Sequence, residues 1–232
     1  GDLGRALCSP DIPPGQVGPT LELFESRRGA PLKGGETTRL LQAFGAAAPP
    51  RWRHAVALLD WLEESPDSAR PNVYTFTGVV TACARAGEWE QAMNVYERMR
   101  VAGVPPSAHT FSALVSACKN AGRWEEALEV LEWMEGAGVL PEVVTYSAVI
   151  GACGAGMQWQ RALAVFELMV EAGVRPDVKT FNTLIRACER GGQAERALET
   201  FERMGREGVA PDAATYDALL AACRRAGRWE LA

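Results

Sequence analysis

The chain has few of the residues from which enzyme active sites are built. Histidine occurs only twice in 232 residues, at His54 and His109, which lie far apart in the sequence. No two of the six cysteines lie two to four residues apart, as zinc ligation requires. A glycine-rich phosphate loop, a serine nucleophile elbow and the zinc deaminase signature are also missing. We therefore expect no catalytic residue, no metal and no cofactor here, and any catalytic domain would lie outside this segment.

Long apolar runs are absent as well. No stretch of eighteen apolar residues occurs, so we expect no membrane span and no membrane partner. The formal net charge is −5, whereas nucleic-acid-binding proteins usually carry a basic face. The negative net charge argues against a nucleic-acid partner unless the positive charges gather on one side of the fold.

What the chain does have is internal repetition with a period of 35 residues. A Thr-aromatic pair opens each copy, and Cys, Ala, Met, Gly and Pro recur at fixed places after it. Self-similarity at such a period is typical of solenoid proteins, in which stacked units share a continuous core. The copies are 73–107, 108–142, 143–177 and 178–212, followed by a truncated unit at 213–232.

Each copy has the pattern of two helices. In the first copy, apolar residues at three- and four-residue spacing predict a helix from about Tyr74 to Ala86, which Gly87 ends. A second helix is expected from near Glu88 to a point before Gly103, because two prolines follow. We therefore expect an all-α fold of stacked helix-turn-helix repeats.

The N-terminal part is more divergent. Residues 1–35 are predicted to be an irregular segment, since 3–18 are rich in proline, with a partial repeat whose second helix covers about 20–28. Residues 36–72 are predicted to be a divergent repeat with helices at 36–44 and 52–64. The chain begins without Met and stops inside an expected helix, so we expect a segment of a longer protein.

Three stretches resemble the pentatricopeptide repeat family. They are Val-Thr-Tyr at 144–146, the Ala-Gly-Arg-Trp-Glu-Glu-Ala-Leu centre at 121–128 and the Gly-Val-Arg-Pro-Asp close at 173–177. The tetratricopeptide repeat has a period of 34 and a Trp-x-x-Leu-Gly-x-x-Tyr first helix, neither of which occurs here. The resemblance, to repeats of the P type, implies a right-handed α-solenoid superhelix that binds single-stranded RNA with one base per repeat.

In the family, the fifth and last residues of a repeat read the base edge. Carried over, Ser147 with Asp177 implies guanine, Asn182 with Asp212 implies uracil, and Thr77 with Ser107 is ambiguous between purines. Two positions depart from the family's pattern, namely Glu142 as a last residue and Asp217 as a fifth residue. The base-reading residues that the resemblance implies are Asn72, Thr77, Ser107, Ser112, Glu142, Ser147, Asp177, Asn182, Asp212 and Asp217.

The second residue of each repeat flanks the bases in this family, and basic residues could contact phosphates. These positions could equally be solvent-exposed helix starts and favourable charges at helix C-termini. The stacking and backbone candidates are Tyr74, His109, Val144, Lys179, Arg85, Lys119, Arg190, Arg224 and Arg225.

Positive charge is concentrated in the expected first helices. The first fourteen residues of the five repeats from Val73 onward hold seven basic residues and two acidic ones, an excess of five positive charges. Since the whole chain carries −5, the remainder carries −10. This asymmetry suits RNA along the first helices and an acidic, soluble outer surface.

Two sets of repeated residues have a structural and a functional interpretation. The five equivalent cysteines, 35 residues apart, are expected to be small buried hydrophobes, although bridging between stacked units stays open. The tryptophans that open second helices, Trp89, Trp124, Trp159 and Trp229, are expected to pack between units rather than to stack on bases. Cys8 fits neither set.

Two functions remain after these exclusions. The resemblance implies an organellar protein, of the chloroplast or mitochondrion, that binds a transcript or ribosomal RNA in processing, stabilisation, splicing or translation. The alternative is a protein-interaction scaffold in a large organellar ribonucleoprotein complex, such as a ribosome or RNA polymerase assembly. A scaffold should expose apolar or acidic side chains along the first helices, whereas an RNA reader should keep them polar and basic.

Overall fold

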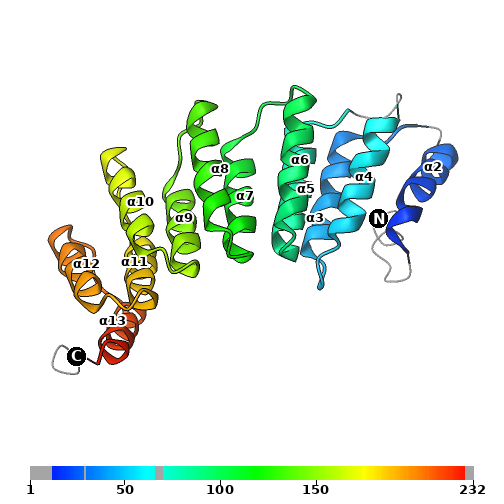
Figure 1. Cartoon of the computed structure of the whole chain (residues 1–232). Coiled ribbons are helices and arrows are strands. Elements are labelled where there is room, and N and C mark those ends of the chain that lie inside the picture. Colours follow the sequence, from blue (N-terminus) through cyan, green and yellow to red (C-terminus); the bar gives the residue numbers. More distant parts are fainter. Residues whose placement is uncertain (1–11, 29, 66–69, 228–232) are drawn as a thin grey trace. The chain divides into compact units, whose positions relative to one another are not determined.

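The computed structural model describes residues 12–28, 30–65 and 70–227, and in these residues every regular element is helical (Figure 1). Trp229, Cys8 and the two chain ends lie outside the described residues. The helices are η1 (Pro14–Gln16), α2 (Val17–Arg28), α3 (Gly34–Ala46), α4 (Trp52–Glu64), α5 (Val73–Ala86), α6 (Trp89–Val101), α7 (Ala108–Asn120), α8 (Trp124–Gly136), α9 (Val143–Ala155), α10 (Trp159–Glu171), α11 (Val178–Arg190), α12 (Ala194–Arg206) and α13 (Ala213–Arg225).

The helix pair α5–α6 shows why the repeat folds as predicted. Asn72 caps α5 by accepting hydrogen bonds from the next backbone N–H groups, and Phe76 on its inner face is fully buried. Gly87 ends α5 with φ 79°, a left-handed conformation that favours glycine. Helix α6 then begins at Trp89 and ends at Val101, before the two prolines.

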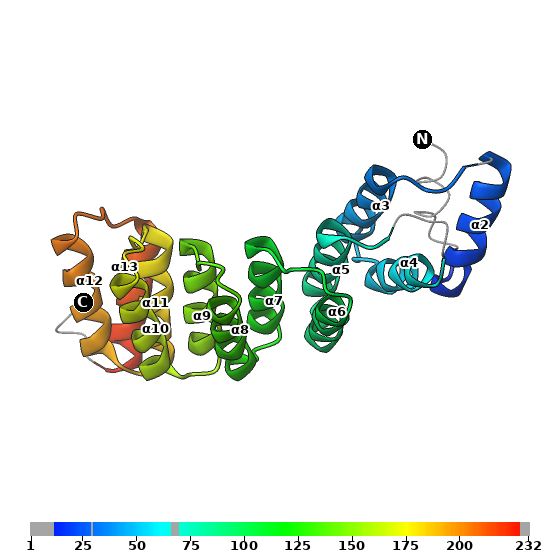
Figure 2. The same cartoon turned by 90° about the horizontal axis from the view of Figure 1, so that it is seen from above.

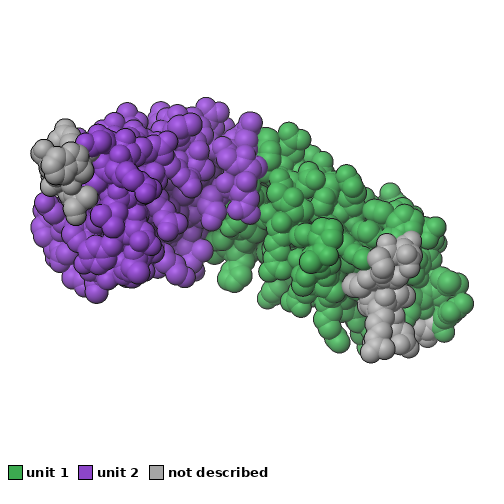
Figure 3. All heavy atoms as spheres, turned by 90° about the horizontal axis from the view of Figure 1, so that it is seen from below, with its two compact units in different colours: residues 1–117 green, residues 118–232 purple. Residues whose placement is uncertain are grey.

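The chain divides into two compact units, residues 1–117 and 118–232 (Figure 3). In the first unit, α3 packs against α5, while α4 packs against both of these helices and α6 against α5. In the second unit, α11 packs between α9 and α13, and α10 and α12 each bridge two consecutive first helices (Figure 2). Each unit is therefore a two-layer stack, in which odd-numbered helices form one layer and even-numbered helices the other.

The first helices α5, α7, α9, α11 and α13 begin 35 residues apart. We therefore propose that the repeat units begin and end where the sequence places them. The N-terminal part differs slightly, because α2 begins at Val17 inside the segment expected to be irregular. Pro19 lies in the first turn of that helix, where a missing N–H costs nothing.

The repeated cysteines are buried and free, including Cys83, Cys118 and Cys153. They pack as small hydrophobes, as expected, and form no bridge. Two of the tryptophans pack against the next repeat, because Trp124 lies against Gly156 and Trp159 against Gly191. A Cβ at Gly156 would lie 2.3 Å from Trp124 Cδ1, so this close approach needs glycine or a shift of the indole.

Candidate nucleic-acid interface

Every first helix from α5 onward has a buried threonine at its third residue. A threonine here can take part in a capping box, in which its hydroxyl and backbone N–H pair with the N-cap residue. The N-cap residue is the last residue of the preceding repeat, so helix capping brings a predicted base-reading residue against the threonine. These threonines are Thr75, Thr110, Thr145, Thr180 and Thr215, each 3 % exposed or less.

The first predicted pair is connected through Thr110. Thr77 Oγ1 lies 2.7 Å from Thr110 Oγ1, which in turn lies 3.0 Å from Ser107 Oγ. Backbone bonds reinforce the cluster, since Ser107 N donates to Thr110 Oγ1 and Thr110 N donates to Ser107 Oγ. The fifth and last residues of this repeat therefore belong to one hydrogen-bonded group.

The same arrangement recurs around Thr180. Thr180 Oγ1 donates to Asp177 Oδ1 at 2.8 Å and lies 2.7 Å from Ser147 Oγ. The backbone N–H of Thr180 also donates to Asp177 Oδ1, at 2.8 Å. Ser147 is half-buried and Asp177 is exposed, so both border solvent at the start of α11.

The third cluster surrounds Thr215. Asn182 Nδ2 donates to Asp212 Oδ1 at 2.9 Å, and Thr215 Oγ1 donates to Asn182 Oδ1 at 2.6 Å. Thr215 N donates to Asp212 Oδ1 as well. Hydrogen bonds from Asn182 and Thr215 hold the pKa of the Asp212 carboxyl below its usual value, because they stabilise the ionised form.

Four further predicted base-reading residues lie outside these three clusters. Ser112 is half-buried in the first unit, whereas Glu142 is exposed in the second unit, where it caps α9 without a side-chain bond. Asp217 is exposed on α13, and Asn72 caps α5 through the backbone N–H groups of Tyr74 and Thr75.

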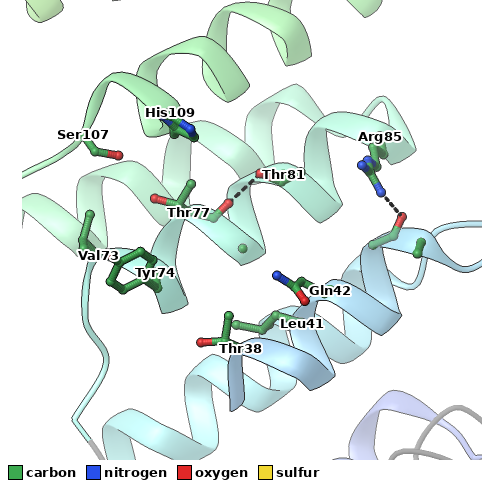
Figure 4. Close-up of a pocket in the computed structure, with 13 residues that line it drawn as sticks. Thr38, Leu41, Gln42, Val73, Tyr74, Thr77, Thr81, Arg85, Ser107 and His109 are labelled. Carbon is green, nitrogen blue, oxygen red and sulfur yellow. Dashed lines mark hydrogen bonds between the residues drawn. The ribbon is translucent and has the colours of Figure 1, made fainter. Parts of the chain in front are cut away.

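A groove of about 760 Å³ lies in the first unit between α3 and α5 (Figure 4). Tyr74 and His109 border it, and both side chains are exposed. Thr77 and Ser107 also line it, so a predicted base-reading pair and two predicted stacking residues share one cavity.

Thr38 lines the same groove and was missed from the sequence. Gly45 of α3 lies against Ala82, as Gly154 of α9 lies against Ala187, so these two glycines are equivalent. Counting back seven residues from each leads to Thr38 and Ser147, which places Thr38 at a fifth position. The longer loop of the divergent repeat hid this register, because a 35-residue count back from Asn72 leads to another residue.

The predicted stacking residues, each the second residue of a repeat, and the basic residues predicted to contact phosphates all reach solvent. Tyr74 is 70 % exposed and Val144 is 66 % exposed, and His109 and Lys179 are exposed too. Two of the exposed basic side chains have protein partners, since Arg85 donates to Gly45 O at 3.1 Å and Arg225 pairs with Glu189 at 3.1 Å. Further exposed basic residues on the first helices are Lys119, Lys179, Arg186, Arg190 and Arg224.

Metal-binding clusters and membrane-spanning helices are both absent from the described part of the chain. No cluster of three or more His, Cys, Asp or Glu side chains in that part could hold a metal ion. None of the described helices is long and apolar enough to cross a membrane. His54 has a structural contact, with Nε2 at 2.8 Å from Ile12 O and its ring against Phe44.

Fold and site together define an α-helical repeat protein of stacked helix pairs, with polar side chains at equivalent positions of its first helices. The model of the pentacotripeptide-repeat region of PRORP matches residues 65–231. The chain therefore belongs to the pentatricopeptide repeat family. No curated protein matches the sequence.

Solved structures of the family resemble the chain. The structure of PPR10, a maize pentatricopeptide repeat protein, in complex with an 18-nt psaJ RNA element is 29 % identical, with a TM-score of 0.72. The match covers 98 % of this chain and 33 % of PPR10, so the chain spans about a third of that protein's length. The PPR domain of Arabidopsis thaliana PRORP1 in complex with tRNA is 20 % identical, with a TM-score of 0.57 over 66 % of this chain and 80 % of that one, and shows the fold alone.

Proposed function

We propose that the chain binds single-stranded RNA along the exposed face of its first helices, with one base per repeat. The observation that carries this proposal is the recurring cluster in which the fifth and last residues of a repeat share one buried threonine. Three repeats, at 73–107, 143–177 and 178–212, have such a cluster. The binding of RNA by PPR10, a relative at 29 % identity, supports the same partner.

The reading residues follow from this proposal. Ser147 with Asp177 would read guanine, Asn182 with Asp212 would read uracil, and Thr77 with Ser107 would accept a purine. Thr38 with Asn72 forms a further pair in the divergent repeat. Ser112 in the first unit, and Glu142 and Asp217 in the second unit, are further proposed base-reading residues.

Stacking contacts with the bases and contacts with the phosphates would come from the second residue of each repeat and from the basic side chains. Tyr74 and His109 offer rings that can stack on bases, and Lys179 can reach a phosphate. Val144 would flank a base by apolar contact. The backbone candidates are Arg85, Lys119, Arg190, Arg224 and Arg225.

The cellular role proposed from the family is organellar RNA metabolism, in a chloroplast or mitochondrion, with other proteins of a ribonucleoprotein complex as further partners. This segment would contribute RNA binding rather than catalysis. Polar side chains at the fifth and last positions favour RNA over a purely protein-binding scaffold, which would need apolar contact surface.

A salt titration of RNA binding tests the proposal. For single strands, the slope of log K against log salt is about −0.7 per phosphate contact, so Lys119→Ala and Lys179→Ala should each make the slope shallower by about 0.7. Arg100→Ala is the matched control, because Arg100 is exposed on the second helix α6 and pairs there with Glu97. Failure to bind a short single-stranded RNA at low salt would refute the function. An equal loss in Arg100→Ala would refute the assigned face.

A further inference from the structure

We propose that the buried threonine between a fifth and a last residue sets which hydrogen-bonding groups the fifth residue offers to the base. The threonines concerned are Thr110, Thr180 and Thr215. Each acts as a positioning residue that does not itself touch the RNA. The inference rests on the proposed RNA-binding function and adds the cause of base preference at each pair.

Burial limits the hydrogen bonds that each of these hydroxyl groups can make. Thr110, Thr180 and Thr215 are each 0 % exposed, so their hydroxyl groups exchange hydrogen bonds with protein atoms rather than with bulk water. A hydroxyl has one proton to donate and two lone pairs to accept with. The direction of one bond in a cluster therefore fixes the direction of the next.

The direction is fixed at Thr180. An ionised carboxylate only accepts, so the Thr180 proton points to Asp177 Oδ1. The Ser147 hydroxyl, 2.7 Å away, must then donate its own proton to Thr180 Oγ1. Only lone pairs of Ser147 remain for the base, beside the carboxylate of Asp177. Two neighbouring acceptors match the N1–H and N2–H donors on the edge of guanine.

The direction is also fixed at Thr215, with a different result. The Asn182 amide must turn Nδ2 toward Asp212, because its oxygen would face a carboxylate otherwise. Thr215 Oγ1 lies 2.6 Å from the amide oxygen and 2.9 Å from Asp212 Oδ1. Because the amide oxygen carries no proton, the shorter contact requires the Thr215 proton, and this bond holds the amide in that orientation. One N–H and one lone pair of the amide remain, which matches the adjacent acceptor and donor of uracil.

No direction is fixed at Thr110. Its partners Thr77 and Ser107 are hydroxyl groups, each of which can donate or accept. The proton chain can run either way, so Thr77 can offer the base a donor or an acceptor. Weak discrimination between purines is expected at this pair, and strong discrimination at the pair around Thr180.

Thr180→Val tests the inference, because valine keeps the shape and removes only the hydroxyl. Affinity is measured for short RNAs that differ only in the base opposite Ser147, as the ratio of Kd values for adenine and guanine. A good base contact discriminates by roughly tenfold or more, and Thr180→Val should bring the ratio close to one. The ratio at the uracil position should stay unchanged, as should the salt slope.

Two control variants separate this effect from a loss of structure. Thr180→Ser restores a hydroxyl and should restore the ratio. Thr183→Val removes a hydroxyl that bonds only within its own helix, to Lys179 O at 2.7 Å, and should leave the ratio unchanged. If Thr180→Val does not fold, the test uses the double variant Thr180→Ser with Asp177→Asn instead. The amide of residue 177 can donate a hydrogen bond to the hydroxyl of residue 180, which reverses the direction of the hydrogen bonds from residue 177 to Ser147. That variant should then prefer adenine to guanine.

The outcomes distinguish the two proposals. If the unmodified protein binds RNA without any base preference, base reading fails and the inference fails with it. If the unmodified protein prefers guanine and Thr180→Val retains that preference, the threonine relay is wrong and base reading stands. Loss of preference in Thr183→Val to the same extent would also overturn the relay.

Discussion

Replacing Met157 by glycine should stabilise the protein. Met157 follows α9 with φ 57°, and it is the one non-glycine residue with positive φ in the described part of the chain. The other repeats have Gly87, Gly122, Gly192 and Gly227 at the same place, all with positive φ. The left-handed conformation costs a non-glycine residue about 1–2 kcal/mol.

The net gain is smaller than this strain. Glycine loses more backbone entropy on folding, which offsets about 0.5–1 kcal/mol. The Met157 side chain is 65 % exposed, so its removal sacrifices little packing. Met157→Gly should therefore raise the free energy of unfolding by about 1 kcal/mol, which corresponds to about 2–4 °C in Tm for a chain of this size.

Thermal and denaturant unfolding of Met157→Gly and Met157→Ala measure this gain. Alanine removes the same side chain and keeps the strain, so the difference between the variants isolates the backbone effect. A glycine variant no more stable than the alanine variant would refute the reasoning.

Two further predictions concern titratable groups. Burial raises the pKa of Cys83 and Cys118 to about 12 and of Cys153 and Cys188 to about 11, so at pH 8 these thiols should react with a thiol reagent far more slowly in the native protein than in denaturant. Rapid reaction of a variant with both Cys8→Ser and Cys223→Ser, which keeps only these four thiols, would contradict this when no denaturant is present. The lowered pKa of Asp212 means that its stabilising contribution is complete above the ordinary aspartate pKa and is lost as the pH falls through the lowered value. The Tm of Asp212→Asn should therefore lie below that of the unmodified protein at neutral pH and approach it in acid, and a pH-independent gap would exclude this explanation.

Local signals in the sequence determined most of the fold. The positions of Gly87 and of the two prolines after α6 ended helices where the structure ends them, because these residues restrict the backbone regardless of context. The period of 35 gave the helix starts, since each apolar stripe needs a neighbouring repeat for burial. The start of α2 at Val17 was missed because proline in a first turn resembles proline in a loop.

The site was only partly predictable. The family pattern identifies Ser147 and Asp177, but their connection through Thr180 depends on the stacking of two helices and has no signal in either residue. In the sequence, Thr180 is only the threonine of a Thr-aromatic pair. Its hydroxyl could have capped its own helix alone, so the sequence does not predict its contact with Ser147. Thr38 was hidden by the longer loop of the divergent repeat, and only its neighbour contacts reveal the register.

The measurement that tests the account most directly is a base-preference assay on Ser147→Asn and Asn182→Ser. Binding of short single-stranded RNAs is compared with all four bases at each of the two adjacent positions. The account predicts guanine and uracil preferences in the unmodified protein, and each variant should change the preference at its own position only. Unchanged preferences, or changes at both positions in either variant, would contradict one-base-per-repeat reading along the first helices.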